Sequence, residues 1–501
     1  MKSFACSVGF KTVFFVLFFA PILIVAQDYP FQLSQDLTAT LNVETSKKEV
    51  FKNTLLGYNI EGFNTNLQKD FIRLVDPITI RFPHGVWSNF YKWQTDGYQN
   101  DSYDNKEHEP VLSGQLVTAK GHIDGIASLN KERIKASKKG FDMMWTYAVN
   151  FDDGLSCVAR AKKDMGLGLE VKDIELGNEP FWETQRANRT ATEADYLREA
   201  SAISAALKAE IPNVRISIPL GWRRNQANFN KNIIGDGRYF DAITVHKYVG
   251  ADPDKPGESN KAYSTLLTAR LELANSVNWI RNNYAPGKPV WLTEWGVSGG
   301  SEVKGAACLG MADIYLYMAE NQQIFERSNW FSFNKVLNAM VVVGRDREPT
   351  YPLRKRGYLS TYEIICSVFK DATMLKVRVT ASTTLNTNLG SVNIVNGSVV
   401  IRDGKTSAII VNLADKPVDF ALKFDNVVYA RNFKHEALVF NSLGVVDPID
   451  FYSNPLILIK QGKGTITLPP LSISKISDLE VFDLDKVNLK KQTKNKRSEE
   501  R

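Results

Sequence analysis

The sequence predicts a (β/α)8 TIM barrel followed by a C-terminal antiparallel β-sandwich domain. Between residues 53 and 370, eight short β-rich runs alternate with longer amphipathic stretches, as expected of right-handed βαβ units around a parallel sheet. Eight repeats over this length favour a closed barrel, and no glycine-rich dinucleotide motif follows the first run. After residue 371 the runs become shorter and are separated by turns, which is typical of an antiparallel sandwich.

The barrel elements follow from the apolar periodicity of each run. The expected strands are Leu55–Glu61, Ile78–Phe82, Phe141–Val149, Lys172–Gly177, Val214–Leu220, Asp241–Tyr248, Pro289–Trp295 and Asn329–Phe333. The expected helices are Phe71–Val75, Ile123–Lys139, Ala159–Gly166, Glu193–Glu210, Tyr263–Asn283, Lys304–Phe325 and Leu353–Phe369.

The sandwich domain is expected over residues 371–485. Its strands are expected at Val399–Arg402, Ser407–Leu413, Phe420–Phe424, Ala437–Phe440, Leu456–Ile459 and Thr465–Leu468. The segment 27–52 precedes the first barrel strand, and its run Ala39–Glu49 is predicted to add a strand to the sandwich.

The two ends of the chain differ from the folded part. Lys2 and Lys11 precede an apolar run, Val13–Val25, and Ala26 offers a small residue for cleavage. Residues 1–26 are therefore interpreted as a secretory signal peptide, because the run is short for a membrane span; an uncleaved anchor is the alternative. No later stretch is apolar enough to span, so the mature protein is expected to be secreted, periplasmic or at the cell surface.

The positive charge of the chain lies mostly at its ends. Of the net charge of +7, two charges belong to the leader and four to residues 490–501, which leaves +1 for the rest. Residues 486–501 are interpreted as a basic disordered tail. Nothing in this distribution points to nucleic acid as a partner.

Two glutamates occupy the positions where a barrel carries its chemistry. Reacting groups in such barrels come from the C-terminal ends of the strands. Expected strand 4 runs into Gly177-Asn178-Glu179-Pro180, and expected strand 7 ends in Thr293-Glu294-Trp295-Gly296. Two facing carboxylates are what glycoside hydrolysis needs, because one protonates the leaving oxygen while the other attacks the anomeric carbon. A pair about 5 Å apart predicts retention of configuration.

These two motifs resemble the acid/base and nucleophile motifs of the retaining glycoside hydrolases of clan A. The resemblance covers the whole barrel and implies that Glu179 is the acid/base and Glu294 the nucleophile. It implies that Asn178 binds the sugar 2-hydroxyl. His246 and Tyr248 match the clan's His-x-Tyr position, where the tyrosine donates to the nucleophile. The clan's reaction requires neither a metal nor an organic cofactor, and the histidines and cysteines show no metal-ligand spacing.

The residues of the second expected strand indicate which family of the clan this chain resembles most. The run Ile80-Arg81-Phe82-Pro83-His84-Gly85 resembles the strand-2 signature of family 51 α-L-arabinofuranosidases, in which Gly-Gly-Asn follows the proline. This chain has His84 in place of the first glycine. Its Asn-Glu-Pro motif is nearer to those of β-xylosidases and heparanase-like β-glucuronidases. We expect Arg81 to orient the nucleophile and keep it ionised, a structural salt bridge being the alternative, and His84 to lie near the substrate.

Aromatic and amide side chains near the strand ends are candidates for binding sugar, because a pyranose stacks its apolar face on an indole. Trp295 and Trp330 are the preferred subsite residues and Trp182 a third candidate, with core packing as the alternative for each. Asn150 is expected to reach a hydroxyl. The loop from Ser88 to Lys120 is long enough to serve as a lid or binding loop.

The sequence thus predicts a secreted retaining glycosidase that acts on plant or algal polysaccharides or oligosaccharides, with α-L-arabinofuranosidase-like specificity as one possibility. An endo-acting glycanase on an anionic or sulfated polysaccharide is the first alternative. A non-catalytic carbohydrate-binding protein on the same fold is the second. The sugar, its ring form and linkage, and exo or endo action stay open.

Overall fold

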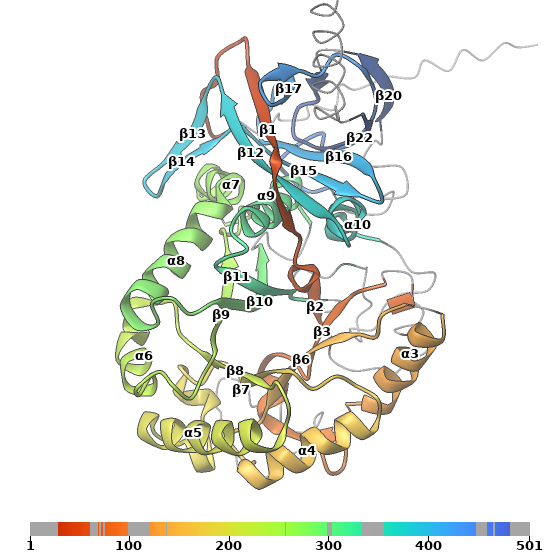
Figure 1. Cartoon of the computed structure of the whole chain (residues 1–501). Coiled ribbons are helices and arrows are strands. Elements are labelled where there is room, and N and C mark those ends of the chain that lie inside the picture. Colours follow the sequence, from red (N-terminus) through yellow and green to blue (C-terminus); the bar gives the residue numbers. More distant parts are fainter. Residues whose placement is uncertain are drawn as a thin grey trace, which may run out of the picture.

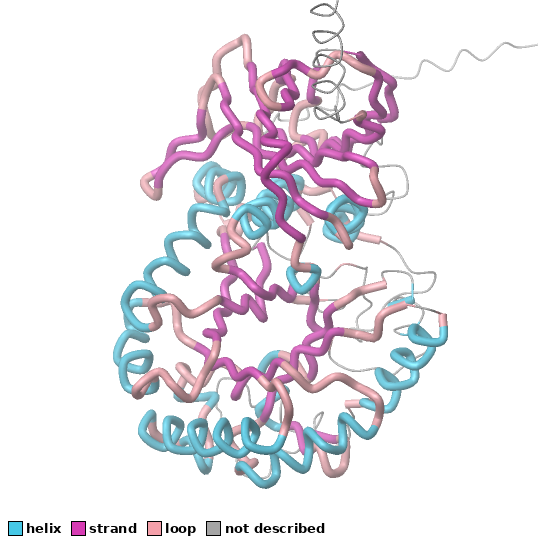
Figure 2. Tube along the Cα trace, viewed as in Figure 1, coloured by secondary structure: helices cyan, strands magenta, loops and turns pink. Residues whose placement is uncertain are grey.

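The computed structural model describes residues 29–60, 69, 72–73, 76–98, 121–136, 138–255, 257–297, 303–332, 340, 355–446, 458–463 and 466–480. The expected signal peptide, the basic tail and most of the expected lid loop lie outside these ranges, as does most of the expected helix at 71–75. The described chain forms a barrel ringed by helices and, above it in the view, a separate curled sheet (Figure 1). Figure 2 shows the strands enclosed by the ring of helices.

Eight parallel strands close the barrel, which confirms the predicted fold class. Their order around the barrel is the order of the chain, so each strand pairs with the next and the last, β11, pairs with the first, β2. The strands are β2 (Gly57–Asn59), β3 (Thr79–Phe82), β6 (Asp142–Tyr147), β7 (Asp173–Leu176), β8 (Arg215–Pro219), β9 (Ala242–Val249), β10 (Val290–Val297) and β11 (Phe325–Trp330).

The helices follow the barrel strands along the chain and cover the outside of the barrel (Figure 1). Within the described residues they are α3 (Ile123–Lys135), α4 (Gly154–Gly166), α5 (Glu193–Glu210), α6 (Ala227–Ile233), α7 (Ser259–Leu267), α8 (Ala269–Tyr284), α9 (Gly305–Glu320) and α10 (Gly357–Phe369). Local sequence fixes several of their starts. The Thr192 hydroxyl accepts from Asp195 N–H at 3.1 Å and Asp153 accepts from Ser156 N–H at 2.9 Å, and such N-caps satisfy helix-end donors.

The second domain is a ten-stranded curled sheet with the order β18-β17-β1-β12-β15-β16-β22-β19-β20, and β21 pairs with β17. Its strands are β1 (Thr38–Val50), β12 (Thr373–Ala381), β15 (Val395–Arg402), β16 (Lys405–Asn412), β17 (Val418–Phe424), β18 (Val427–Val428), β19 (Asn432–Val439), β20 (Leu458–Lys463), β21 (Ile466–Leu468) and β22 (Ser472–Leu479). All pairs are antiparallel except β1 with β17. Two hairpins complete the strands: β4 (Tyr91–Lys92) with β5 (Gly97–Tyr98), and β13 (Thr384–Thr387) with β14 (Gly390–Asn393).

Strand β1 lies inside this sheet although the rest of the sheet comes from the end of the chain. It pairs antiparallel with β12 and parallel with β17, with Leu41 opposite both Val379 and Leu422. Alternate residues Ala39, Leu41 and Val43 are buried, which matches the period of two expected of a strand with one covered face. The chain then passes directly from β1 to the first barrel strand, so both domains share this segment.

None of the helices in the described ranges has the length and apolar character needed to cross a bilayer.

Candidate active site

The segment after β7 holds Glu179 in an unusual backbone conformation. Gly177 has φ 80° and Glu179 has φ 44°; a left-handed conformation is uncommon for a glutamate and persists only where the surroundings hold it. Here the side-chain amide of Asn89 bonds both backbone groups of Asn178. Its Oδ1 accepts from the Asn178 N–H at 2.9 Å, and its Nδ2 donates to the Asn178 carbonyl at 3.0 Å. The carbonyl of Glu179 also accepts from Trp182 N–H at 2.9 Å. The strand end therefore presents the Glu179 side chain at the barrel mouth, where it is 20% exposed.

Glu294 faces Glu179 from the middle of β10. The Tyr248 hydroxyl donates to its Oε1 at 2.8 Å, and Arg81 Nη1 donates to its Oε2 at 3.1 Å. Three side chains meet here: Glu179, Glu294 and His246 each contribute one polar atom, and these three atoms lie within 4.8 Å of one another. Burial and the nearby Glu179 raise the pKa of Glu294 above its usual value, although His246, Arg81 and the tyrosine hydrogen bond each lower it in part.

Arg81 is the centre of the polar network inside the barrel. Its side chain is fully buried, and its Nε and Nη2 donate to the two oxygens of Glu175 at 3.0 and 2.9 Å. Further N–H groups donate to Asn59 and Asn178, both at 2.9 Å. Burial alone would raise the pKa of Glu175, but Arg81 and His246 lower it below its usual value. Arg81 thus links the nucleophile position on Glu294 to a second, permanently paired carboxylate.

His246 lies between the carboxylates and carries a proton. Its Nδ1 is 3.2 Å from Glu179 Oε1, and its Nε2 is 3.2 Å from Glu175 Oε1. Burial alone would lower the pKa of His246, but Glu294 and the hydrogen bonds to Glu175 and Glu179 raise it to about 9. This shift favours the protonated form of the ring near neutral pH.

This shift predicts a pH dependence of stability. Because the folded-state pKa of His246 lies above the unfolded value of about 6.5, its contribution is complete below pH 6.5, declines as the pH rises towards 9 and is lost above it. The contribution is about 3 kcal/mol. Urea unfolding of wild type and His246→Gln at pH 6 and pH 9.5 measures it: the gap between the two proteins should shrink at the higher pH. His122→Gln, remote from the site, is the matched control, and an unchanged gap contradicts the prediction.

Gln185 is a site residue that the motifs did not reveal. Its Nε2 donates to Glu179 Oε2 at 2.8 Å, and its Oε1 accepts from Asn178 and Asn89 at 2.9 and 3.0 Å. It lies in the short helix Glu183–Gln185, where no strand end or motif marks it. Gln185 therefore fixes the direction of the Glu179 carboxylate.

The prediction that Asn150 reaches a sugar hydroxyl is wrong. The side chain is buried, and its Nδ2 donates to the carbonyl of Gln185 at 3.0 Å. Its Oδ1 accepts from Ala187 N–H at 3.3 Å and from the Thr190 hydroxyl. Both ends of the amide are thus used to hold the segment that carries Gln185.

The subsite assignment of Trp295 and Trp330 is also wrong. Their exposed fractions are 1% and 0%, and they meet edge to face at 4.7 Å between ring centroids. Trp295 packs on Tyr315 of α9 and Trp330 on Tyr358 of α10. Because neighbouring strand residues point to opposite faces, Trp295 points away from the lumen that Glu294 faces. Both indoles fill the layer between barrel and helices.

Phe331 takes the place at the mouth that was expected of a tryptophan. Trp330 is the last residue of β11 and points outward. Because side chains alternate along a strand, that of the next residue points inward. The half-buried Phe331 ring lies 5.3 Å from the His84 ring and 6.0 Å from that of Tyr248. His84 is 1% exposed, and neither ring nitrogen has a hydrogen-bond partner among the described residues. Burial and nearby Arg81 hold the pKa of His84 well below its usual value.

Glu179, His246 and Glu294 are close enough together to hold a metal ion. Their chemistry does not fit one well. His246 Nδ1 is 3.2 Å from Glu179 Oε1, so a hydrogen bond between these two atoms competes with a metal for both of them. The oxygens of Glu294 already accept from Tyr248 and Arg81.

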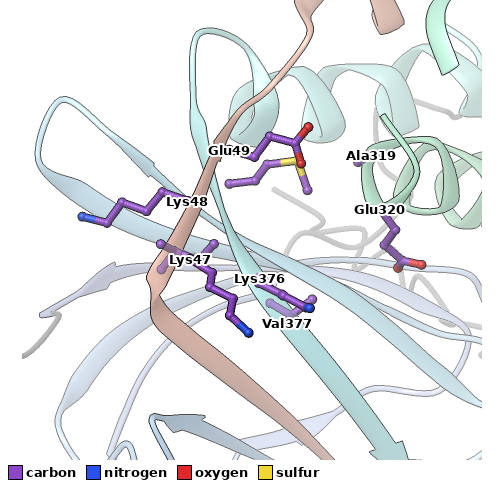
Figure 3. A pocket seen from close by; sticks show the side chains of 9 residues that line it. Lys47, Lys48, Glu49, Ala319, Glu320, Lys376 and Val377 are labelled. Carbon is purple, nitrogen blue, oxygen red and sulfur yellow. The ribbon is translucent and has the colours of Figure 1, made fainter. Parts of the chain in front are cut away.

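A separate hollow of about 370 Å³ lies where the sheet domain meets the barrel. Figure 3 shows Lys47 and Lys48 of β1 and Lys376 of β12, with Glu320 of α9 opposite them. Three lysines and two glutamates, Glu49 and Glu320, contribute to its lining, and Lys47 is paired with Glu44 at 2.6 Å. The chemistry is placed at the barrel mouth, where Glu179 and Glu294 approach each other beside His246.

Comparison with known proteins finds similarity at the level of structure. No protein-family model matches the chain, and no curated protein does. A GH51 arabinofuranosidase from Xanthomonas axonopodis pv. citri aligns over 88% of this chain and 100% of its own, with a TM-score of 0.67 and 14% identity. An α-L-arabinofuranosidase from Thermotoga maritima aligns over 88% and 99%, with a TM-score of 0.67 and 15% identity.

A family 44 xyloglucanase from Paenibacillus polymyxa aligns over 88% of this chain and 99% of its own, with a TM-score of 0.56 and 12% identity. The resemblance to clan A barrels, family 51 included, is thereby confirmed for the fold. The chain shares with these structures a (β/α)8 barrel joined to a β-sheet domain.

Proposed function

We propose that this protein is a secreted retaining glycosidase that acts on plant or algal polysaccharides or their oligosaccharides. The observation that carries the proposal is the pair Glu179 and Glu294, whose oxygens lie within 4.8 Å across the barrel mouth. Retaining enzymes place their carboxyl groups about 5–5.5 Å apart, whereas inverting enzymes leave room for a water. The partners of the two carboxylates differ, as the two roles require.

In the first step, a carboxylate oxygen of Glu294 attacks the anomeric carbon while the bond from that carbon to the leaving oxygen breaks. The hydrogen bonds from Arg81 and Tyr248 favour the ionised, attacking form of Glu294. The leaving oxygen takes a proton from Glu179. His246 Nδ1 lies 3.2 Å from Glu179 Oε1, within hydrogen-bond distance of this carboxyl.

In the second step, Glu179 accepts a proton from water, and the resulting hydroxide oxygen bonds to the anomeric carbon as the bond to Glu294 breaks. Gln185 and His246 hold the two oxygens of Glu179 at 2.8 and 3.2 Å, so the same carboxyl can serve as acid and then as base. The buried Asn178 amide is held by Arg81 and Gln185 beside Glu179, where we place the sugar 2-hydroxyl.

Arabinofuranoside is the first substrate to test, because two of the structural neighbours are arabinofuranosidases. A panel of aryl glycosides identifies the sugar: α-L-arabinofuranoside, β-D-xyloside, β-D-glucoside, β-D-galactoside and β-D-glucuronide. Proton NMR of the first-formed product should show the anomeric configuration of the substrate. Products of opposite configuration would exclude the mechanism. Binding of a polysaccharide with no hydrolysis of any substrate would favour a non-catalytic carbohydrate-binding protein.

Replacing Glu179 should produce a loss that depends on the leaving group. In Glu179→Ala, hydrolysis of a glycoside with a poor leaving group, such as an alcohol, should fall about 10²- to 10⁴-fold, the usual value of general acid catalysis. A dinitrophenyl leaving group needs no proton, so glycosylation should survive, and azide should give a glycosyl azide of retained configuration. Equal losses for both leaving groups would contradict the acid/base role. Glu183→Ala, an exposed glutamate nearby, is the control.

A further inference from the structure

Two tryptophans and two cations come together near the C-terminal ends of neighbouring barrel strands, and one of them, Trp182, lies three residues after Glu179. We call this group the rim cluster: Trp182, Trp222, Arg223 and Lys247. Its members follow or end the adjacent strands β7, β8 and β9. The Arg223 guanidinium lies 5.1 Å from the ring centroid of Trp182 and 5.1 Å from that of Trp222. Lys247 Nζ lies 3.6 Å from the Trp222 ring.

The two cations of the rim cluster differ in how they are neutralised. Lys247 is buried and forms an ion pair with Glu272 of α8, whose other oxygen accepts from Gly250 N–H at 2.8 Å. Burial lowers the pKa of Lys247, and the nearby charge of Arg223 lowers it further. Arg223 is exposed. Among the residues that the structure describes, no carboxylate forms an ion pair with it. The positive charge of Arg223 is therefore not neutralised by an ion pair within the described residues.

The aromatic rings orient this open charge. When the flat face of a guanidinium lies against an indole ring, its N–H groups point outward in the guanidinium plane and can still donate hydrogen bonds. Such a fork binds a carboxylate or a sulfate through two parallel hydrogen bonds. The position also matters: Trp182 is one turn beyond Glu179 and donates its N–H to the Glu179 carbonyl. An acid that protonates the leaving oxygen faces the leaving sugar, so the rim cluster lies on the leaving-group side.

We infer that the rim cluster is a subsite for an anionic sugar, a uronate or a sulfate ester, in the part of the substrate that leaves. The inference rests on the proposed function and names the substrate class of the same site. It predicts that Arg223 contributes to polysaccharide and oligosaccharide binding and has no role with simple aryl glycosides, which lack the leaving sugar.

Arg224 offers a matched control. It is the next residue, is also exposed, and its guanidinium also lies over an indole, but that indole is Trp279 of α8 at 5.9 Å. A substitution there removes the same charge from the same loop without touching the rim cluster.

Calorimetric titration in a Glu294→Gln background, which prevents turnover, tests the inference. The ligands are oligosaccharides of glucuronoxylan and of a sulfated galactan, each beside its carboxyl-reduced or desulfated counterpart. Added Arg223→Gln should weaken binding of at least one anionic ligand 10-fold or more, since hydrogen bonds to charged groups are among the stronger ones. Its uncharged counterpart, and Arg224→Gln with either ligand, should change less than 2-fold. Which ligand responds separates uronate from sulfate.

Two results would overturn the inference: equal losses in Arg223→Gln and Arg224→Gln, or anionic ligands that bind no tighter than their uncharged counterparts. The proposed function is tested separately by hydrolysis. An Arg223-dependent affinity without turnover by the wild type keeps the subsite and rejects the glycosidase. If the wild type hydrolyses aryl and neutral substrates but Arg223→Gln does not weaken binding of anionic ligands, the glycosidase is kept and the subsite is rejected.

Discussion

Glu294→Ala should reduce kcat/KM on the best aryl glycoside on the order of 10⁴-fold or more, as removal of a covalent nucleophile does in other enzymes. The physical reason is that no other described carboxylate can replace it. Glu175 is tied to Arg81 by two hydrogen bonds, and Glu179 lies on the side of the leaving oxygen. The variant should fold, because the shortened side chain leaves a polar space at the mouth and not a cavity in the core.

Azide distinguishes loss of the nucleophile from loss of the fold. Azide can enter the space left by the carboxylate and attack the anomeric carbon from the same side, giving a glycosyl azide of inverted configuration. The Glu179→Ala variant should give the retained product, so the two variants are matched opposites. Exposed Glu183→Ala should behave as wild type. Activity that survives in Glu294→Ala without azide would reject the assignment of the nucleophile.

Arg81→Met should lower the free energy of unfolding by about 3–5 kcal/mol, the usual cost of breaking a buried ion pair from one side. The substitution leaves the fully buried Glu175 carboxylate without its bidentate partner and removes a donor from Glu294. Urea unfolding at pH 7 measures the change. Activity should also be lost, because the Glu294 carboxylate loses the cation that favours its ionised form.

The double variant Arg81→Met/Glu175→Leu separates the structural from the catalytic role of Arg81. Replacing both partners by apolar groups removes the unpaired buried charge, so much of the lost stability should return. Activity should not return, because Glu294 still lacks its N–H donor. Recovery of activity together with stability would mean that Arg81 acts only as a structural salt bridge. Arg238→Met, which removes an exposed pair with Asp236, should leave the unfolding midpoint unchanged.

The sequence by itself determined the barrel and the position of its chemistry. Parallel strands are buried on both faces and appear as apolar runs, so seven of the eight were predicted close to their observed ranges. The rule that strand ends carry the reacting groups then selected Glu179 and Glu294. Their approach and the hydrogen bond from Tyr248 to Glu294 follow once the barrel closes.

Only the tertiary structure decided which neighbours of those residues face the substrate. The last strand, expected at Asn329–Phe333, is found at Phe325–Trp330, and its register against its neighbours decides which of its alternating side chains face inward. Phe331 therefore lies at the mouth while Trp330 is in the core. The partners of Glu179 likewise depend on contacts between distant segments.

The same limit applies to the polar network and to the sheet domain. The bond of Arg81 to Glu175 joins two strands with 94 residues between their positions, and no local pattern marks that pairing. Strand β12 alternates exposed charged residues, Lys376 and Arg378, with half-buried valines, so its sequence resembles a surface segment. It becomes a strand because β1, from the other end of the chain, supplies hydrogen-bond partners along its length. Local propensity cannot encode such partners, since they exist only after the chain has folded.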